Sequence, residues 1–207
     1  MATTEQEKQK SSDTTGSGAR GRSGAAGLSN FQTIAGATAA GAVLGVLAMI
    51  GRKAVVQAPT FLAGDWDEAL AAEHQATLKV FDALEATDET STTKRGALLA
   101  NLKHMLAKHA MEEENVIYPA LRDAGEKEAA DHLNADHGYV KQYLYELDMM
   151  PNSSPAFLTT LRKFRTDIET HMREEEDELF PRLKAKLTPE KTAQLTKAMN
   201  KEGFKLA

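Results

Sequence analysis

Apolar residues recur every three or four positions from about residue 66 onward, which is the spacing of one face of an amphipathic helix. The first such stretch extends to about residue 87 and follows Asp65, a residue type that caps helix N-termini. A second stretch runs over about 91–122 and ends at the turn-forming segment 123–125. The pattern therefore predicts two successive helices.

Two more amphipathic stretches follow, over about 126–150 and 156–187, with prolines at their boundaries. Pro189 then marks the start of a short fifth helix, because proline is favoured in the first helical turn. Residues typical of strands are sparse. Four long amphipathic helices joined by short loops predict an all-α fold, an up-and-down antiparallel four-helix bundle over residues 63–187, followed by a short C-terminal helix in 188–207.

The N-terminal leader has a different composition. Residues 1–30 are mostly Ser, Thr, Gly and charged residues, which predicts a disordered tail with a basic lean. Residues 31–62 contain a Gly- and Ala-rich apolar helix, in which the segment 33–50 has no charge and carries Gly41 and Gly45 at a spacing that permits close helix contact. Its length suits a marginal membrane span, but its small residues make transfer into lipid weakly favourable. Membrane association, a docking helix and a partner-binding segment all stay open.

Composition and charge narrow the chemistry. The chain has no cysteine, so disulfides, thiolate catalysis and cysteine-ligated metal sites are excluded, and any metal must bind to histidine and carboxylate. The formal net charge is −5; residues 1–60 hold six Lys or Arg and three Asp or Glu, a net +3, so the remainder carries −8. An acidic domain lacks the basic surface that a protein needs to bind the phosphates of nucleic acid, so we expect no nucleic-acid partner.

The two halves of the predicted bundle repeat one another. HAMEEENVIYPAL at 109–121 matches HMREEEDELFPRL at 171–183, and LAAEH at 70–74 matches LNADH at 133–137. Each pair aligns a histidine with a histidine. A duplicated helix pair related by a pseudo-twofold axis would bring these matched positions together at the centre of the bundle.

Helical geometry selects the residues that face inward. A residue four positions on lies about 40° around the helix and shares a face, whereas a residue five positions on lies about 140° away. Glu114 and Glu176, at the fifth position after a histidine, are therefore expected to face solvent or to act as outer acceptors, as are Glu112 and Glu174. The inward set consists of the four matched histidines and the two glutamates four positions after a histidine: His74, His109, Glu113, His137, His171 and Glu175.

Two inward carboxylates at the middle of a bundle would cost several kcal/mol without a partner. A pair of cations removes that cost, and four imidazoles with two carboxylates suit two iron ions bridged by both carboxylates. Zinc is a possible occupant of purified protein. A ferritin-like site is a poorer match, because it requires Glu-x-x-His pairs and no acidic residue stands three positions before any matched histidine.

The double His-x-x-x-Glu motif, followed by EExxxYP in one half and EExxxFP in the other, resembles the hemerythrin-like family of histidine/histidine/glutamate cation-binding proteins over about residues 66–187. The resemblance implies two non-haem iron ions, bridged by oxo or hydroxo groups and carboxylates, that meet dioxygen or peroxide. It also implies that the four histidines are terminal ligands and that Glu113 and Glu175 are the bridges. Tyr118 and Phe180 are expected to pack and bend the helix ends.

One departure from the family's oxygen carriers stands at Leu133. The carriers have a further histidine four residues before the ligand of the third helix, and this chain has leucine there. His132 lies about 140° from His137 around the helix, so it is no ready replacement, and we expect His132 and His104 to be surface or outer residues. Fewer protein ligands favour sensing or redox turnover over reversible oxygen carriage.

Three functions stay open at this point: dioxygen binding or sensing, peroxide decomposition of the catalase or peroxidase kind, and iron binding or sensing. Only the second would make the protein an enzyme. We expect a cytoplasmic protein, with membrane or partner contact through residues 33–50 as the open alternative.

Overall fold

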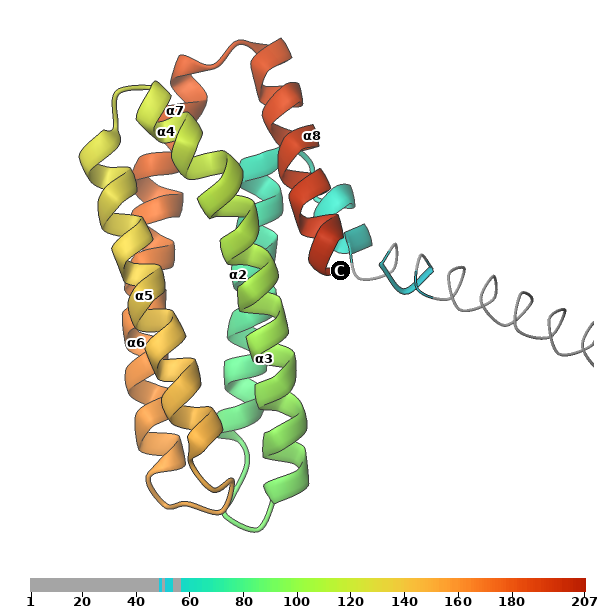
Figure 1. Cartoon of the computed structure of the whole chain (residues 1–207), viewed down its shortest axis with the longest axis vertical. Coiled ribbons are helices and arrows are strands. Elements are labelled where there is room, and N and C mark those ends of the chain that lie inside the picture. Colours follow the sequence, from blue (N-terminus) through green and yellow to red (C-terminus); the bar gives the residue numbers. More distant parts are fainter. Residues whose placement is uncertain (1–48, 50, 54–56) are drawn as a thin grey trace, which may run out of the picture. The chain divides into compact units, whose positions relative to one another are not determined.

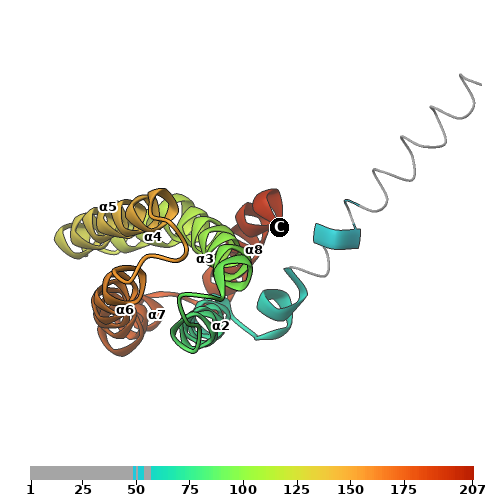
Figure 2. The same cartoon turned by 90° about the horizontal axis from the view of Figure 1, so that it is seen from below.

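The computed structural model describes residues 49, 51–53 and 57–207, and the regular structure within these residues is helical, with no strand. Four long helices run up and down in antiparallel order (Figure 1): α2 (Trp66–Glu85), α3 (Thr92–Glu112), α5 (Lys127–Met149) and α6 (Phe157–Glu174). Viewed along the bundle they surround a common centre (Figure 2). The predicted all-α four-helix bundle is confirmed.

Shorter segments extend two of the long helices. η1 (Glu113–Ile117) and α4 (Tyr118–Asp123) continue α3, while η2 (Glu175–Leu179) and α7 (Phe180–Lys186) continue α6. α8 (Pro189–Leu206) covers 18 residues and packs against the outside of α3 (Figure 2). The C-terminal helix thus covers one face of the bundle.

Local chemistry explains where helices begin and turn. The backbone N–H of Asp65 donates to the Glu68 carboxylate at 3.1 Å, which satisfies one of the free donors at the start of α2. Thr188 accepts a hydrogen bond from the backbone N–H of Lys191 at the start of α8. Gly125 joins α4 to α5 with φ of 89°, a conformation that side chains disfavour.

The segments η1 and η2 are π-helical turns at matched positions of the two halves. Pro119 and Pro181 lie two residues after the ends of these turns, and a proline has no N–H to donate to the carbonyl four residues earlier. A π turn, which is wider than an α-helical turn, accommodates the loss of this backbone hydrogen bond. Each π turn begins at an inward glutamate of the predicted set, and such turns often occur at functional sites. The expected continuous helix over 91–122 is therefore interrupted where the candidate chemistry lies.

Two apolar clusters lie along the bundle. One gathers large side chains from α2, α4, α5 and α7, including Trp66, Tyr118, Leu133 and Phe180. The other gathers side chains from α2, α3, α5 and α6, including Phe81, Leu147 and Phe164. The histidines and glutamates of the predicted set belong to neither cluster, although they are buried. They form a buried polar layer, and such a layer needs compensating partners.

The predicted apolar segment 33–50 lies, apart from Met49, outside the described residues. Among the helices of the described part of the chain, none combines the length and apolar character that crossing a membrane requires.

Candidate metal centre

All six residues of the predicted inward set point into the polar layer. α2, α3, α5 and α6 each supply one histidine, and the first residue of each π turn supplies a glutamate. None of these residues is more than 6% exposed. The members are His74, His109, Glu113, His137, His171 and Glu175.

Glu113 faces two imidazoles with its two oxygens. Its Oε1 lies 3.1 Å from His109 Nε2, and its Oε2 lies 3.3 Å from His137 Nε2. One donor group comprises Glu113, Glu175 and the histidines of α2 and α3, and a second comprises Glu113 and the histidines of α5 and α6. Within each group the donor atoms lie within 4.8 Å of one another. A carboxylate shared in this way is placed to bridge two cations.

Glu175 also reaches both sides of the layer. Its Oε2 lies 3.5 Å from the Nε2 atoms of both His74 and His171, which belong to different donor groups. The second glutamate is therefore placed like the first, between two imidazoles on separate helices.

Several of these buried atoms lack a hydrogen-bond partner. They are Glu113 Oε1, Glu175 Oε2 and both ring nitrogens of His171. A buried polar atom without a partner costs about 1–3 kcal/mol, so this layer would be strongly unfavourable by itself. Cations would satisfy these atoms, and imidazole with carboxylate suits divalent and trivalent transition metals. The residues present therefore fit a pair of metal ions.

Each of the four histidines has a carboxylate near its second ring nitrogen, Nδ1. The pairing follows the internal repeat, because matched histidines have matched carboxylates. Such partners orient a metal-binding imidazole and raise its basicity. The Nδ1–oxygen distances are 2.6 Å for His74–Glu176, 3.0 Å for His109–Glu73, 2.9 Å for His137–Glu114 and 3.5 Å for His171–Asp136.

Two of these carboxylates were expected to face solvent or to act as outer acceptors, and the second role is the one found. Glu114 and Glu176 are only 29% and 31% exposed and reach across to histidines of neighbouring helices. They lie in the π turns, whose wider pitch changes the angles of a regular helix. Sequence reasoning did not single out Glu73 and Asp136, although an acidic residue directly precedes the matched histidine in both LAAEH and LNADH.

Tyr118 contributes a polar group that the sequence reasoning did not anticipate. Its hydroxyl donates to Glu175 Oε1 at 2.8 Å and lies 3.0 Å from His137 Nε2, with the ring buried. The matched residue Phe180 has no hydroxyl and packs its ring edge against Trp66. The two donor groups therefore have different surroundings, despite the repeat.

Glu112 is fully buried, which contradicts the expectation of a solvated flank. Lys108 donates to its two oxygens at 2.9 and 3.0 Å, and Gln57 donates to one of them at 3.2 Å. A Cβ atom at Gly203 of α8 would lie 1.7 Å from the Glu112 carboxylate. The covering helix α8 and residue 57, neither of which the repeat contains, explain why this glutamate is enclosed.

Burial and neighbouring charges alter proton affinities in the centre. Burial, reinforced by the charge of Glu113, raises the pKa of Glu175 to about 8. For Glu113 itself, burial acts in the same direction, but the charge of His109 and the close approach of the His109 and His137 imidazoles hold its pKa well below the usual range. Burial opposes the charged form of His109, yet Glu113 and Glu73 raise its pKa well above the usual value. Binding of cations must therefore displace protons.

Comparison with known proteins places this geometry in a family. The family model of the hemerythrin HHE cation-binding domain matches residues 67–183. A hemerythrin-like protein of Schizosaccharomyces pombe is 29% identical over 99 residues, which cover 46% of this chain and 49% of that protein. A DNA nickase of Nostoc is 29% identical over 89 residues, covering 43% of this chain and 25% of the nickase. The chain thus spans about half or less of these relatives.

A solved structure agrees with the family model. The crystal structure of a hemerythrin HHE cation-binding domain-containing protein from Mycobacterium kansasii has a TM-score of 0.60 and 26% sequence identity, and it covers 69% of this chain and 87% of that protein. The matched region 67–183 is more than half of the 207 residues and contains all six buried donors. This chain therefore belongs to the hemerythrin HHE cation-binding domain family.

Proposed function

We propose that the protein binds two non-haem iron ions in this centre and reacts with dioxygen or with peroxide. The observation that carries the proposal is the pair of buried donor groups that share Glu113. His74 and His109 would hold one ion, and His137 and His171 the other. Glu113 and Glu175 would bridge the two, because each lies close to imidazoles of both groups.

A bound iron pair would supply electrons and open coordination positions for an oxygen-derived ligand. The surrounding residues prepare that chemistry. The outer carboxylates at Nδ1 direct the Nε2 atom of each imidazole toward the centre. The Tyr118 hydroxyl donates a hydrogen bond to Glu175 and so reduces the electron-donating strength of that carboxylate.

The approach to the centre is narrow and apolar. A small cavity lies beside the four histidines and is lined further by Leu106, Val140, Ile168 and Met172. The small size of this cavity excludes a bulky ligand. It favours a small molecule such as dioxygen or peroxide over a larger organic substrate as the molecule that reacts at the buried pair.

Peroxide decomposition is the second candidate, and Leu133 is the observation that favours it. This position is fully buried and supplies no imidazole, so one ion has fewer nitrogen donors than in the family's oxygen carriers. Fewer nitrogen donors leave more exchangeable positions and favour turnover over stable carriage. Sustained release of oxygen from added peroxide would support this candidate, and a stable oxygen adduct that reverses under vacuum would contradict it.

The test begins with an anaerobic iron assay, followed by optical spectra after addition of oxygen and of peroxide. We expect about two iron atoms per chain, and we expect Glu113→Ala and Glu175→Ala to lose most of the iron. Glu178→Ala is the matched control, because Glu178 is 64% exposed and its ion pair among the described residues is with Arg182, four residues along the chain. Iron content that is the same in both bridging variants and in the control would refute the assignment.

A further inference from the structure

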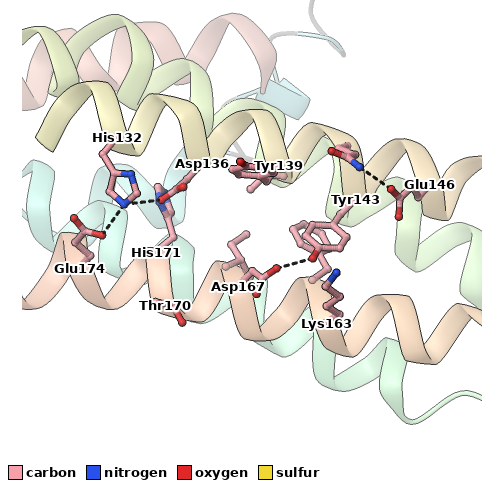
Figure 3. A pocket seen from close by; sticks show the side chains of 14 residues that line it. His132, Asp136, Tyr139, Tyr143, Glu146, Lys163, Asp167, Thr170, His171 and Glu174 are labelled. Carbon is pink, nitrogen blue, oxygen red and sulfur yellow. Dashed lines mark hydrogen bonds and ion pairs between the residues drawn. The ribbon is translucent and has the colours of Figure 1, made fainter. Parts of the chain in front are cut away.

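A further group of histidine and carboxylate side chains lies outside the buried centre, at one end of a groove between α5 and α6 (Figure 3). The groove has a volume of about 610 Å³ and is lined along its length by residues of these two helices. His132 and Asp136 come from α5, and Glu174 comes from α6. Their donor atoms all lie within 4.8 Å of one another.

The distances within this outer cluster suit a single cation. His132 Nε2 lies 3.7 Å from Asp136 Oδ2 and 3.6 Å from Glu174 Oε2 (Figure 3), which is beyond hydrogen-bond distance. Ligands at 2.0–2.2 Å from a tetrahedral metal ion are roughly 3.4 Å apart. Small side-chain adjustments would therefore bring all three donors to one ion.

The spacing of the outer cluster repeats that of the buried centre. His132 and Asp136 are separated by four residues, as are the histidine and glutamate of each inward pair. Four residues place both donors on one face of a helix, where they can chelate an ion. With neutral histidine, the two carboxylates give the cluster a charge of −2, which attracts a cation.

A direct link joins the outer cluster to the buried centre. Asp136 Oδ2, which faces His132, also lies 3.5 Å from His171 Nδ1. His171 is only 6% exposed, its ring nitrogens have no hydrogen-bond partner, and it lines the same groove. One carboxylate oxygen therefore stands between a surface imidazole and a buried one (Figure 3).

We propose that His132, Asp136 and Glu174 form a third cation site, which takes a divalent transition metal and passes Fe²⁺ toward the buried pair. The site is partly open, with His132 59%, Glu174 32% and Asp136 25% exposed, so water completes the coordination and the ion exchanges readily. Three protein donors with exchangeable water suit transient capture more than permanent storage. Only the delivery role rests on the proposed iron function.

The ion-pair alternative predicts a different result. A protonated His132 would attract both carboxylates without any metal, and an exposed pair of this kind contributes little to stability. In that case the cluster would bind no added cation, and substituting His132 or Glu174 would not affect iron uptake.

The site is tested on the full chain carrying its two irons, titrated anaerobically with Co²⁺ at about pH 7.5. We expect one Co²⁺ per chain beyond the irons, with at least tenfold weaker binding in His132→Ala and in Glu174→Gln and unchanged binding in Glu178→Gln. Both substituted side chains are partly exposed, and helical circular dichroism verifies folding. No additional Co²⁺, or equal binding by all variants, overturns the site.

The delivery role is tested by the rate at which metal-free protein takes up Fe²⁺. We expect His132→Ala and Glu174→Gln to fill severalfold more slowly and still to reach the iron content of the unmodified chain. Equal filling rates overturn delivery. If the buried centre retains no iron but Co²⁺ binding still depends on His132, the proposed function fails and the outer site stands.

Discussion

Replacing Glu176 with glutamine should weaken metal binding without removing any atom that contacts the metal. The Glu176 carboxylate lies 2.6 Å from His74 Nδ1, a short contact typical of an ionised acceptor. Glutamine keeps an oxygen at this position but removes the charge. His74 then becomes a poorer donor through Nε2, and its ring is held less firmly.

The expected loss of metal affinity depends on how far the Glu176 side chain is exposed to solvent. Loss of such an outer partner typically reduces metal affinity by about 10- to 100-fold, or about 1.4–2.7 kcal/mol. Glu176 is 31% exposed, so water screens part of its charge, and we expect a loss near the lower end, roughly tenfold. Glu114→Gln should give a similar loss, because Glu114 is 29% exposed and lies 2.9 Å from His137 Nδ1.

The assay is an anaerobic competition between the protein and a chelator of known iron affinity, with helical circular dichroism to verify folding. Glu178→Gln is the control, since it removes the same charge from the same region of the chain without contacting a histidine. Iron retention by Glu176→Gln equal to that of the unmodified chain would refute the reasoning. An equal loss in Glu178→Gln would show that net charge alone is responsible.

Three further predictions concern protons, packing and redox properties. Because burial raises the pKa of Glu175 to about 8, iron must displace its proton below that pH, so the iron affinity measured by chelator competition should rise as the pH increases toward 8. Gly203→Ala places a Cβ atom 1.7 Å from the Glu112 carboxylate and should cost about 1–3 kcal/mol in chemical unfolding, whereas Gly138→Ala, with nothing within 4 Å, should not destabilise the metal-free protein. Tyr118→Phe removes the hydrogen bond to Glu175, worth about 0.5–1.5 kcal/mol, and so makes that carboxylate a stronger electron donor to the iron. Spectroelectrochemistry should therefore find the reduction potential of the iron pair lower by about 20–65 mV, and an unchanged reduction potential would contradict this.

Local periodicity by itself determined the four long helices and the inward direction of six buried donors. Helical spacing is a property of neighbouring residues, so the four-residue separation of His109 and Glu113 places both on one face wherever the helix packs. The internal repeat then indicated that the matched positions meet, because duplicated helix pairs pack around a pseudo-twofold axis. The absence of cysteine restricted the donors to imidazole and carboxylate.

Tertiary structure alone decided which side chains meet across different helices. Glu176 reaches His74 from 102 residues away, and α8 encloses Glu112, which a solitary helix would leave in water. Tyr118 turns its hydroxyl between the two glutamates, whereas its repeat partner turns an apolar ring toward Trp66. These contacts depend on helix register, on the π turns and on the covering helix. Such features arise from the packing of whole elements, because no short segment determines its distance to another.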